Sequence, residues 1–280
     1  MEILQLVNIG SQKLGNKDIP SHRLDSEILL SHVLKKTREE LLVNLDLKVA
    51  SSKIANFKKL IARRSLKEPI AYILREKEFW SKNFIVNNHT LVPRPETELM
   101  VEKIVKIFGS KDIFILDIGT GTGCILLSIL SELKKSKGVG IDISSNALKI
   151  AYENSKRQKL SNRVKFYRKS LTDFSNNRFD LIVSNPPYIM KKDLKNLAED
   201  IKKFEPKLAL DGGNDGLDVI KKVIYKSKSI LKIKGMLALE IGNEQFRKVS
   251  KILRNNKFKT RYLVNDYRTN IRCILSTLEN

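Results

Sequence analysis

The 280-residue sequence predicts an α/β protein: a doubly wound, largely parallel sheet of seven strands, preceded by a small all-α domain and a β-hairpin. After Gly109, short apolar runs alternate with segments of helical periodicity, which is typical of a parallel sheet covered on both faces. Before residue 75, apolar residues recur mainly at helical spacing. A glycine-rich loop joins the first predicted strand to a helix, so the backbone there can approach a ligand closely.

Residues 1–74 are predicted to form the helical domain. Thr37 can cap a short helix that begins at Arg38, and a longer helix is predicted over residues 52–65. Glu68 ends this helical region, because a residue that precedes proline avoids the helical conformation. The domain contains no catalytic constellation of side chains.

Residues 75–95 are predicted to form a β-hairpin that links the helical domain to the sheet. The pattern becomes aromatic and β-branched from Tyr72 onward, and we place the turn at the polar residues 87–90. Pro93-Arg94-Pro95 closes the linker stiffly, since each proline fixes its φ angle. Acidic residues at 96 and 98 then favour the start of a helix, which opens the domain of residues 96–280.

The domain of residues 96–280 is predicted to alternate strands and helices. Strands are expected at Ile113–Ile118, Val139–Ile143, Val164–Arg168, Phe179–Ser184 and Met236–Ile241, with a final antiparallel pair at Phe258–Val264 and Ile271–Ser276. Helices are expected at Cys124–Lys134, Ser145–Arg157, Leu217–Leu231 and Asn243–Arg254. The polar residues 189–216 form a long connection, which we interpret as a mobile lid.

The composition gives a formal net charge of +22, from 53 Lys and Arg residues against 31 Asp and Glu residues. Such a charge favours nucleic acid, ribosomal material or another acidic partner. The alternative is a solvated surface, because the lysines fall in scattered pairs. Cys124 and Cys273 have no metal-ligand spacing, which favours a reducing compartment and predicts neither a disulfide scaffold nor a metal site. No signal-peptide pattern or membrane-spanning apolar stretch occurs, so we expect a cytoplasmic protein.

The run Asp117-Ile-Gly119-Thr-Gly-Thr-Gly123 follows a strand and opens a helix. Its G-x-G-x-G spacing differs from the dinucleotide fingerprint, which counts against a nicotinamide enzyme. Asp142 ends the second strand, about 20 residues after the loop, where a carboxylate can accept both hydroxyls of a ribose. The alternative role of Asp142 is to cap the next helix. Loop and acid together favour a cofactor that contains a ribose.

The run Asn185-Pro-Pro-Tyr188 ends the fourth predicted strand. The prolines fix the path of the chain, so the Asn185 side-chain carbonyl, the Pro186 backbone carbonyl and the Tyr188 ring are expected to face one spot. Two acceptors and an aromatic face suit a planar group that carries an NH2. Holding both hydrogens aims the nitrogen lone pair at an electrophile. The alternative is a simple strand-to-loop turn.

These motifs occur with others along nearly the whole chain: Asp25–Leu30, Arg63-Arg64, Glu68–Tyr72, Glu78–Trp80, Leu91–Glu98, Phe204–Pro206 and Leu239–Gly242. Together they resemble the PrmC/HemK family of class I S-adenosylmethionine-dependent methyltransferases. This family methylates the glutamine of the Gly-Gly-Gln motif in peptide chain release factors. Asn-Pro-Pro-Tyr is shared with adenine-N(6) nucleic-acid methyltransferases, whereas the linker motif and the N-terminal module look specific to the glutamine enzymes.

The resemblance implies S-adenosylmethionine as the cofactor and the class I methyltransferase fold for the sheet domain. It implies that the cofactor is bound by Gly119, Thr120, Gly121, Thr122, Gly123, Asp142, Ser170, Leu171 and Asn185. It also implies that Asn185 and Pro186 bind the glutamine amide, with Pro187 and Tyr188 packed beside it, and that residues 1–74 recognise the substrate.

The chain departs from the family pattern at two places. Ser170-Leu171 stands where the family usually has an acidic residue and then Trp or a large apolar residue, near the cofactor adenine. The segment Asp266–Arg272 keeps the family's Asp and Arg but lacks its usual glycine, so the local turn is expected to differ.

We therefore expect a monomeric, cytoplasmic enzyme that methylates a release factor glutamine and needs no strong general base. One competing hypothesis is an adenine-N(6) nucleic-acid methyltransferase, which the positive charge and the shared Asn-Pro-Pro-Tyr favour. Its N-terminal module, however, lacks a concentrated basic and aromatic face. The other is a cofactor-binding module that acts by docking alone.

Overall fold

The computed structural model describes residues 1–173 and 178–279, which form two compact units. Unit 1 comprises residues 1–76 and 198–204, and unit 2 comprises residues 77–197 and 205–280. The short segment of residues 198–204, far from the N-terminus in sequence, therefore belongs with the N-terminal residues. Each unit has its own buried apolar cluster.

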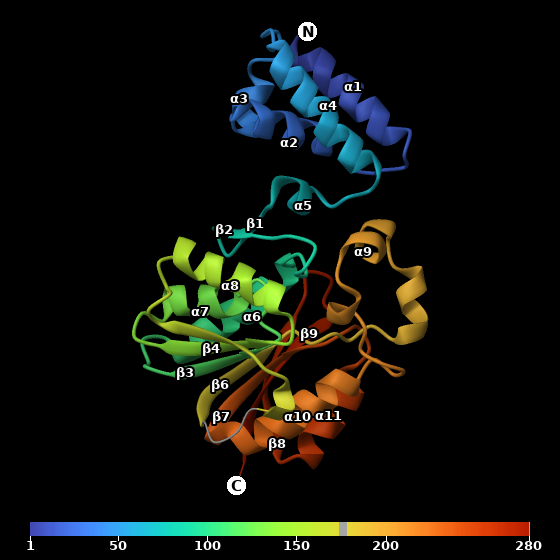
Figure 1. Cartoon of the computed structure of the whole chain (residues 1–280). Helices are drawn as coiled ribbons and strands as arrows, with labels where there is room; N and C mark the ends of the chain where they lie inside the picture. The colour runs from blue at the N-terminus through green and yellow to red at the C-terminus, as the bar shows by residue number, and fades with distance from the viewer. Residues whose placement is uncertain (174–177, 280) are drawn as a thin grey trace. The chain divides into compact units, whose positions relative to one another are not determined.

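Unit 1 is helical, as the sequence predicted (Figure 1). Its helices are α1 (Ile3–Gly15), α2 (His22–Leu34), α3 (Arg38–Leu42), α4 (Ser51–Ser65), α5 (Ile70–Leu74) and α9 (Glu199–Phe204). Thr37 caps α3 as expected, because its hydroxyl accepts the Glu40 amide at 3.1 Å. A buried ion pair joins α2 to α4, with Arg64 Nε 2.6 Å from Asp25 Oδ2. Lys67 lies 3.5 Å from Glu199 and ties α9 to the same unit.

The hairpin is present, but the prediction of its turn is wrong. Strands β1 (Glu76–Phe79) and β2 (Lys82–Ile85) are joined at Trp80 and Ser81, which have φ angles of +53° and +52°. Two successive positive φ angles match the twist of a tight hairpin, but these residue types carry no sequence signal for it. Residues 87–90 instead form a separate polar turn. The extended pattern read from Tyr72 is also wrong, since that residue lies in α5.

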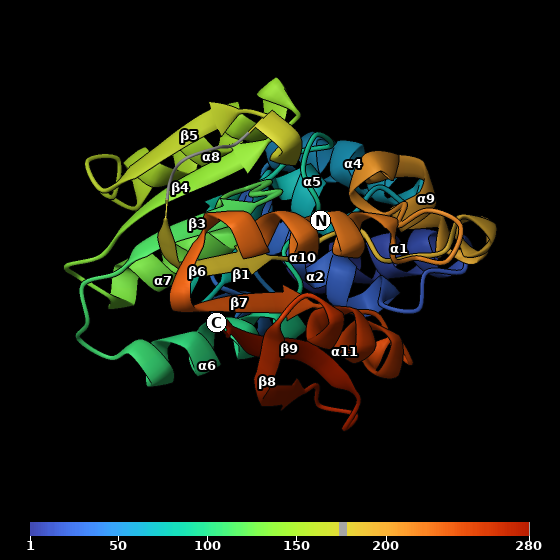
Figure 2. The same ribbon diagram turned by 90° about the horizontal axis from the view of Figure 1, so that it is seen from below.

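Unit 2 contains the predicted seven-stranded sheet, in the order β5-β4-β3-β6-β7-β9-β8 (Figure 2). Its strands are β3 (Phe114–Ile118), β4 (Lys137–Asp142), β5 (Val164–Arg168), β6 (Phe179–Ser184), β7 (Leu231–Glu240), β8 (Phe258–Asn265) and β9 (Ile271–Leu278). The first five are parallel, and β9 runs antiparallel to both β7 and β8. The prediction of a doubly wound sheet with a terminal antiparallel pair is confirmed.

Helices cover both faces of this sheet, because its central strands are apolar on both sides (Figure 1). One cluster joins the sheet to α6 (Pro95–Phe108) and α7 (Cys124–Glu132), with α8 (Ser145–Arg157) packed beside α7. The opposite cluster joins it to α10 (Asp218–Ile230) and α11 (Phe246–Asn255). Cys124 and Cys273 are both buried and free.

The connection between β6 and α10 is not devoid of structure. It contains the 3-10 helices η2 (Lys191–Asn196) and η3 (Lys207–Ala209) on either side of α9, while a further one, η1 (Leu171–Asp173), follows β5. The Ile189 amide donates to Leu210 and the Gly212 amide donates back to Ile189, at 3.2 and 2.8 Å. These bonds hold the two ends of the connection together, and its role as a lid stays a prediction.

Candidate active site

The site begins where β3 and β6 end side by side. Ile118 pairs with Ser184 in the parallel register, so the loop after each strand starts at the same level of the sheet. The chain leaves β3 toward β4 on one side and passes to β6 on the other, which makes this pair the switch point of the sheet. Ligands of doubly wound sheets bind at the carboxyl ends of the strands at such a point. The glycine loop and Asn185-Pro-Pro-Tyr188 are therefore neighbours.

The loop of residues 119–123 is shaped by its glycines. Gly119, Gly121 and Gly123 have φ angles of +73°, +53° and +79°, a region that other residues rarely adopt. The amides of Gly119 and Thr120 both donate to the Ile141 carbonyl, which folds the loop over the end of β4. A Cβ added to Gly119 would meet nothing within 4 Å. The loop thus presents open space beside exposed backbone, at the start of α7.

A buried carboxylate lies beneath this loop. Asp117 is 1% exposed, and its Oδ2 accepts the Thr120 hydroxyl at 2.8 Å. Its Oδ1 has no hydrogen-bond partner among the described residues. Burial raises the pKa of Asp117 to about 7, with the Asp142 charge as a further cause. An unpaired buried carboxylate oxygen, two residues before the open space at Gly119, is suited to a cationic ligand group.

Asp142 lies at the end of β4, beside the same loop. Its Oδ2 accepts the Gly121 amide at 3.0 Å and its Oδ1 accepts the Ser144 amide at 2.9 Å. The capping of α8 is performed by the Ser144 hydroxyl, which accepts the Ala147 amide. Burial raises the pKa of Asp142. Each carboxylate oxygen still has a lone pair for a hydroxyl, so the ribose role predicted for Asp142 remains open to it.

Ser170 and Leu171 lie next to Asp142 along the sheet edge. Asp142 pairs with Arg168 in the β4–β5 register, and the Lys169 amide donates to the Asp142 carbonyl at 3.1 Å. Leu171 is partly buried against the apolar cluster that α10 shares with the sheet. Its position beside the predicted ribose site is compatible with an adenine contact, which stays a prediction.

Asn185 has two different sides. Its Nδ2 donates to Thr97 Oγ1 at 3.4 Å, whereas its Oδ1 has no partner in the described part of the chain. The Pro186 carbonyl likewise accepts no bond within residues 1–173 and 178–279. The predicted pair of acceptors is therefore available to a ligand. Pro186 is buried, and Asn185, Pro187 and Tyr188 are partly exposed.

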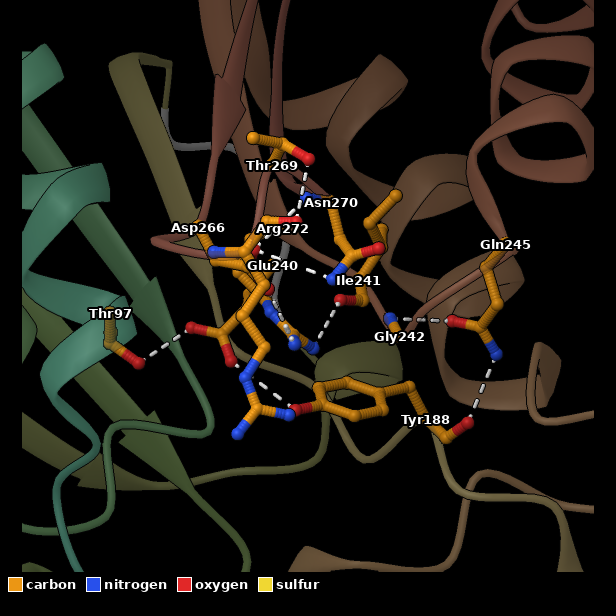
Figure 3. A network of polar contacts seen from close by, with 11 residues as sticks. Thr97, Tyr188, Glu240, Ile241, Gly242, Gln245, Asp266, Thr269, Asn270 and Arg272 are labelled. Carbon is orange, nitrogen blue, oxygen red and sulfur yellow. Dashed lines mark hydrogen bonds and ion pairs between the residues drawn. The ribbon is translucent and has the colours of Figure 1, made fainter.

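Side chains from two other elements hold Asn185 and Tyr188. Figure 3 shows Thr97, Glu240 and Tyr188 of this network. Glu240, the last residue of β7, accepts the Thr97 hydroxyl at 2.6 Å through Oε2 and the Tyr188 hydroxyl at 3.4 Å through Oε1. Ser184 pairs with Leu239, so Glu240 and Asn185 end adjacent strands. Thr97 comes from the first turn of α6.

Both ionisable groups of this network have raised pKa values. Burial raises the pKa of Glu240 to about 7, although its bond from Thr97 and the charge of Arg272 lower it. Burial, with the charge of Glu240, raises the pKa of Tyr188 to about 12, so its hydroxyl stays protonated and donates. The carboxyl at the end of β7 therefore sits near the midpoint of its titration at neutral pH.

The backbone of Tyr188 is fixed as well. Gln245 donates its Nε2 to the Tyr188 and Gly216 carbonyls at 3.0 and 3.2 Å, and its Oε1 accepts the Gly242 amide at 2.9 Å (Figure 3). A Cβ on Gly212 would lie 2.8 Å from the Tyr188 Cα. The turn after β6 is thus packed against the loops that precede α10 and α11.

The segment Asp266–Arg272, which lacks the glycine usual in the family, contains the turn between β8 and β9. Asp266 Oδ1 accepts the amides of Arg268 and Asn270 at 2.9 Å each, and its Oδ2 accepts Arg272 Nη2 at 3.1 Å (Figure 3). Thr269 takes a φ angle of +67° in this turn. The turn therefore forms without glycine, with a β-branched residue in the left-handed region.

The residues present fit a cationic cofactor that contains a ribose. The unpaired Asp117 oxygen, the open space at Gly119 and the carboxylate of Asp142 lie around one loop. The described residues hold no group of three or more His, Cys, Asp or Glu side chains placed to bind a metal ion. None of the described helices is both long and apolar enough to cross a lipid bilayer.

Three residues of the site were not singled out from the sequence: Thr97, Asp117 and Glu240. Each lies in a motif that was recognised, but sequence position alone gives no reason to single out its side chain. An acidic residue at the end of an otherwise apolar predicted strand was the available signal for Asp117 and Glu240, since such groups are rarely buried without a function.

Comparisons with known proteins agree across both units. Residues 5–74 match the family described as the PrmC N-terminal domain, and residues 110–277 match a methyltransferase domain. The second match covers more than half of the chain. Because the helical module and the sheet are matched separately, the two assignments are independent.

The relatives extend over almost the whole chain. A release factor glutamine methyltransferase of Buchnera aphidicola subsp. Acyrthosiphon pisum is 39% identical over 97% of this chain and 97% of its own length. A bifunctional methyltransferase of Rickettsia prowazekii is 35% identical over 97% of this chain, which spans only 56% of that protein. A methyltransferase structure from Pyrococcus furiosus, 16% identical, covers 81% of this chain with a TM-score of 0.55 and shares its fold.

Proposed function

The chain belongs to the release factor glutamine methyltransferase family, and on that premise we propose that it methylates a glutamine in a peptide chain release factor. The methyl group comes from S-adenosylmethionine, and the acceptor is the side-chain amide nitrogen of the glutamine in the Gly-Gly-Gln motif. Residues 1–74 contribute to recognition of the protein substrate, and the enzyme works in the cytoplasm.

One observation carries the proposal: Asn185 Oδ1 and the Pro186 carbonyl are unpaired within the described part of the chain, beside the glycine loop. A primary amide has two N–H donors on one nitrogen, so it matches two acceptors on one turn. An alcohol or a carboxylate acceptor would leave one of the carbonyls without a donor. The site therefore favours an NH2 group.

S-adenosylmethionine, when bound, supplies an electrophilic methyl group on a cationic sulfur. The unpaired Asp117 Oδ1 would pair with its ammonium group, and Asp142 would accept its ribose hydroxyls. The glycine loop allows close approach of the backbone, and Leu171, which packs against the apolar cluster shared with α10, would contact the adenine.

Asn185 and Pro186 do the work on the substrate side. An amide nitrogen is a poor nucleophile because its lone pair is delocalised into the carbonyl group. Two accepted hydrogen bonds orient the N–H groups and favour the geometry in which the lone pair is free. Tyr188 packs beside the planar amide, and the proton that the nitrogen loses passes to water, so no strong base is needed.

The test is incubation with labelled S-adenosylmethionine and, in parallel, a release factor, the same factor with its Gly-Gly-Gln glutamine changed to alanine, and total DNA and RNA. We expect label on the intact release factor alone. Label on nucleic acid alone would overturn the proposal and assign the net charge of +22 to substrate binding. Cofactor binding without label on any substrate would point to a docking module.

A further inference from the structure

We propose that Thr97 and Glu240 are positioning residues that fix the side-chain amide of Asn185 with its carbonyl oxygen toward the substrate. This inference rests on the proposed function, because it explains how the acceptor pair is kept in the correct orientation. In this role neither Thr97 nor Glu240 contacts the substrate or the cofactor; both act through Asn185.

The direction of the hydrogen bonds carries the argument. A threonine hydroxyl has one hydrogen, and Thr97 gives it to Glu240 Oε2 over 2.6 Å. Thr97 Oγ1 can therefore offer only a lone pair to Asn185, which must answer with Nδ2 at 3.4 Å. Since the amide is planar, Oδ1 then points away from Thr97. The orientation of Asn185 is thus set by the carboxylate at the end of β7.

The second oxygen of Glu240 is also occupied. It accepts the Tyr188 hydroxyl at 3.4 Å, so one carboxylate orders a residue on each side of the prolines (Figure 3). In its ionised form the Glu240 carboxylate only accepts hydrogen bonds, so in that form both hydroxyls must donate to it. The charge of Arg272, held by Asp266, favours that ionised form.

Burial gives this arrangement its selectivity. Thr97 and Glu240 are each 2% exposed, so water does not replace the bonds between them. If the Asn185 amide turned over, its oxygen would face the lone pair of Thr97 and its NH2 would face the NH2 of the substrate. Both contacts are repulsive, and buried polar groups without partners are costly.

A merely structural role, in which the pair only ties α6 to β7, predicts different behaviour. It predicts that Thr97→Val changes stability but not turnover, because valine keeps the branched shape of threonine and loses only its hydroxyl. A positioning role predicts that turnover falls while cofactor affinity and the apparent KM for the release factor change little. Serine, which keeps the hydroxyl, separates loss of the hydrogen bond from loss of the methyl group.

The experiment compares Thr97→Val with Thr97→Ser and the unchanged enzyme, using a release factor and S-adenosylmethionine. We expect kcat to fall about tenfold to a hundredfold in Thr97→Val and to stay within about threefold in Thr97→Ser. Unchanged kcat in a folded Thr97→Val enzyme overturns the inference. If that variant does not fold, Glu240→Gln decides, because glutamine keeps the shape but leaves only one acceptor; full kcat there overturns the inference too.

A measurement without substrate separates this inference from the proposed function. The Nδ2 protons of Asn185 are identified by NMR as the signals that Asn185→Ala removes. We expect them to exchange with solvent about tenfold faster in Thr97→Val than in the unchanged protein and in Thr97→Ser. Equal exchange in all three proteins contradicts the positioning role, whichever substrate the enzyme methylates.

Discussion

The ends of β3 and β7 each carry a buried carboxylate, and the two differ in how many partners they have. Asp117 is 1% exposed and Glu240 is 2% exposed, and burial raises the pKa of each to about 7. Asp117 leaves one oxygen unpaired among the described residues, whereas both oxygens of Glu240 accept hydroxyls. The Asp117 carboxylate can still bind a ligand, whereas the hydrogen bonds of the Glu240 carboxylate are all made within the protein.

This difference separates a binding group from a positioning group. An unpaired buried oxygen is unfavourable in the free protein, and a cationic ligand that pairs with it recovers the lost interaction. A fully paired carboxylate has nothing to gain from a ligand, so its role is to order the residues that do meet one. The loop at β3 is built locally from glycines, while the turn at β6 depends on side chains from α6 and β7.

The largest effect is expected at the residue that Glu240 orders through Thr97. Asn185→Ala removes one of two acceptors for the substrate amide, so kcat should fall by about a hundredfold to a thousandfold. Cofactor affinity, measured by calorimetry, should stay within about threefold, since most of the predicted cofactor contacts come from the loops after β3, β4 and β5. Unchanged turnover would show that Asn185 does not bind the substrate amide, and the contrast between a binding group at β3 and a positioning group at β7 would then fail.

The corresponding change at β3 should weaken cofactor binding. Asp117→Asn keeps the shape but removes the buried charge beneath the glycine loop, and we expect the Kd for S-adenosylmethionine to rise about tenfold to a hundredfold. The matched control is Asp112→Asn, on the exposed residue that precedes the same strand. Equal affinities in both variants would mean that Asp117 does not contact the cofactor.

Both carboxylates should also make folding depend on pH. Because each pKa is raised in the folded protein, the folded state binds the proton more tightly than the unfolded chain. This contribution to stability is complete below the ordinary carboxyl pKa and is lost as pH rises through about 7.

Urea unfolding at pH 5 and pH 8 measures this effect. Relative to the unchanged protein, Asp117→Asn should lose about 2–3 kcal/mol less between the two pH values, since asparagine does not titrate. Glu240→Gln should behave in the same way. Identical pH dependence in all three proteins would mean that neither carboxyl group has a raised pKa.

The smallest effect is expected in the turn that supports Arg272. Thr269 has a φ angle of +67°, so Thr269→Gly should raise the free energy of unfolding by about 0.5–1 kcal/mol. Thr277→Gly, within β9, is the control and should lower stability, because glycine weakens a strand. A lower melting temperature in Thr269→Gly would show that other contacts of the threonine outweigh the strain.

Hydrophobic pattern was sufficient to predict the sheet. The bounds of β5 and β6 and of α8 match the prediction, because apolar runs and helical spacing are local properties. The hairpin turn was placed wrongly, since Trp80 and Ser81 are not the residue types that usually take positive φ angles. The local conformation there is imposed by surrounding contacts, including the bond from the Trp80 amide to Glu98.

The sequence by itself predicted the succession of strands and helices along the chain, the glycine loop, and Asn185 and Pro186 as a pair of hydrogen-bond acceptors for the substrate. These follow from neighbouring residues, whose backbone preferences act over short range. Only the tertiary structure decided which way the Asn185 amide faces. Thr97 and Glu240 are 88 and 55 positions away from it in sequence, and they meet it because β6 and β7 end side by side under α6. Hydrogen-bond direction depends on partners in space, which a linear pattern does not contain.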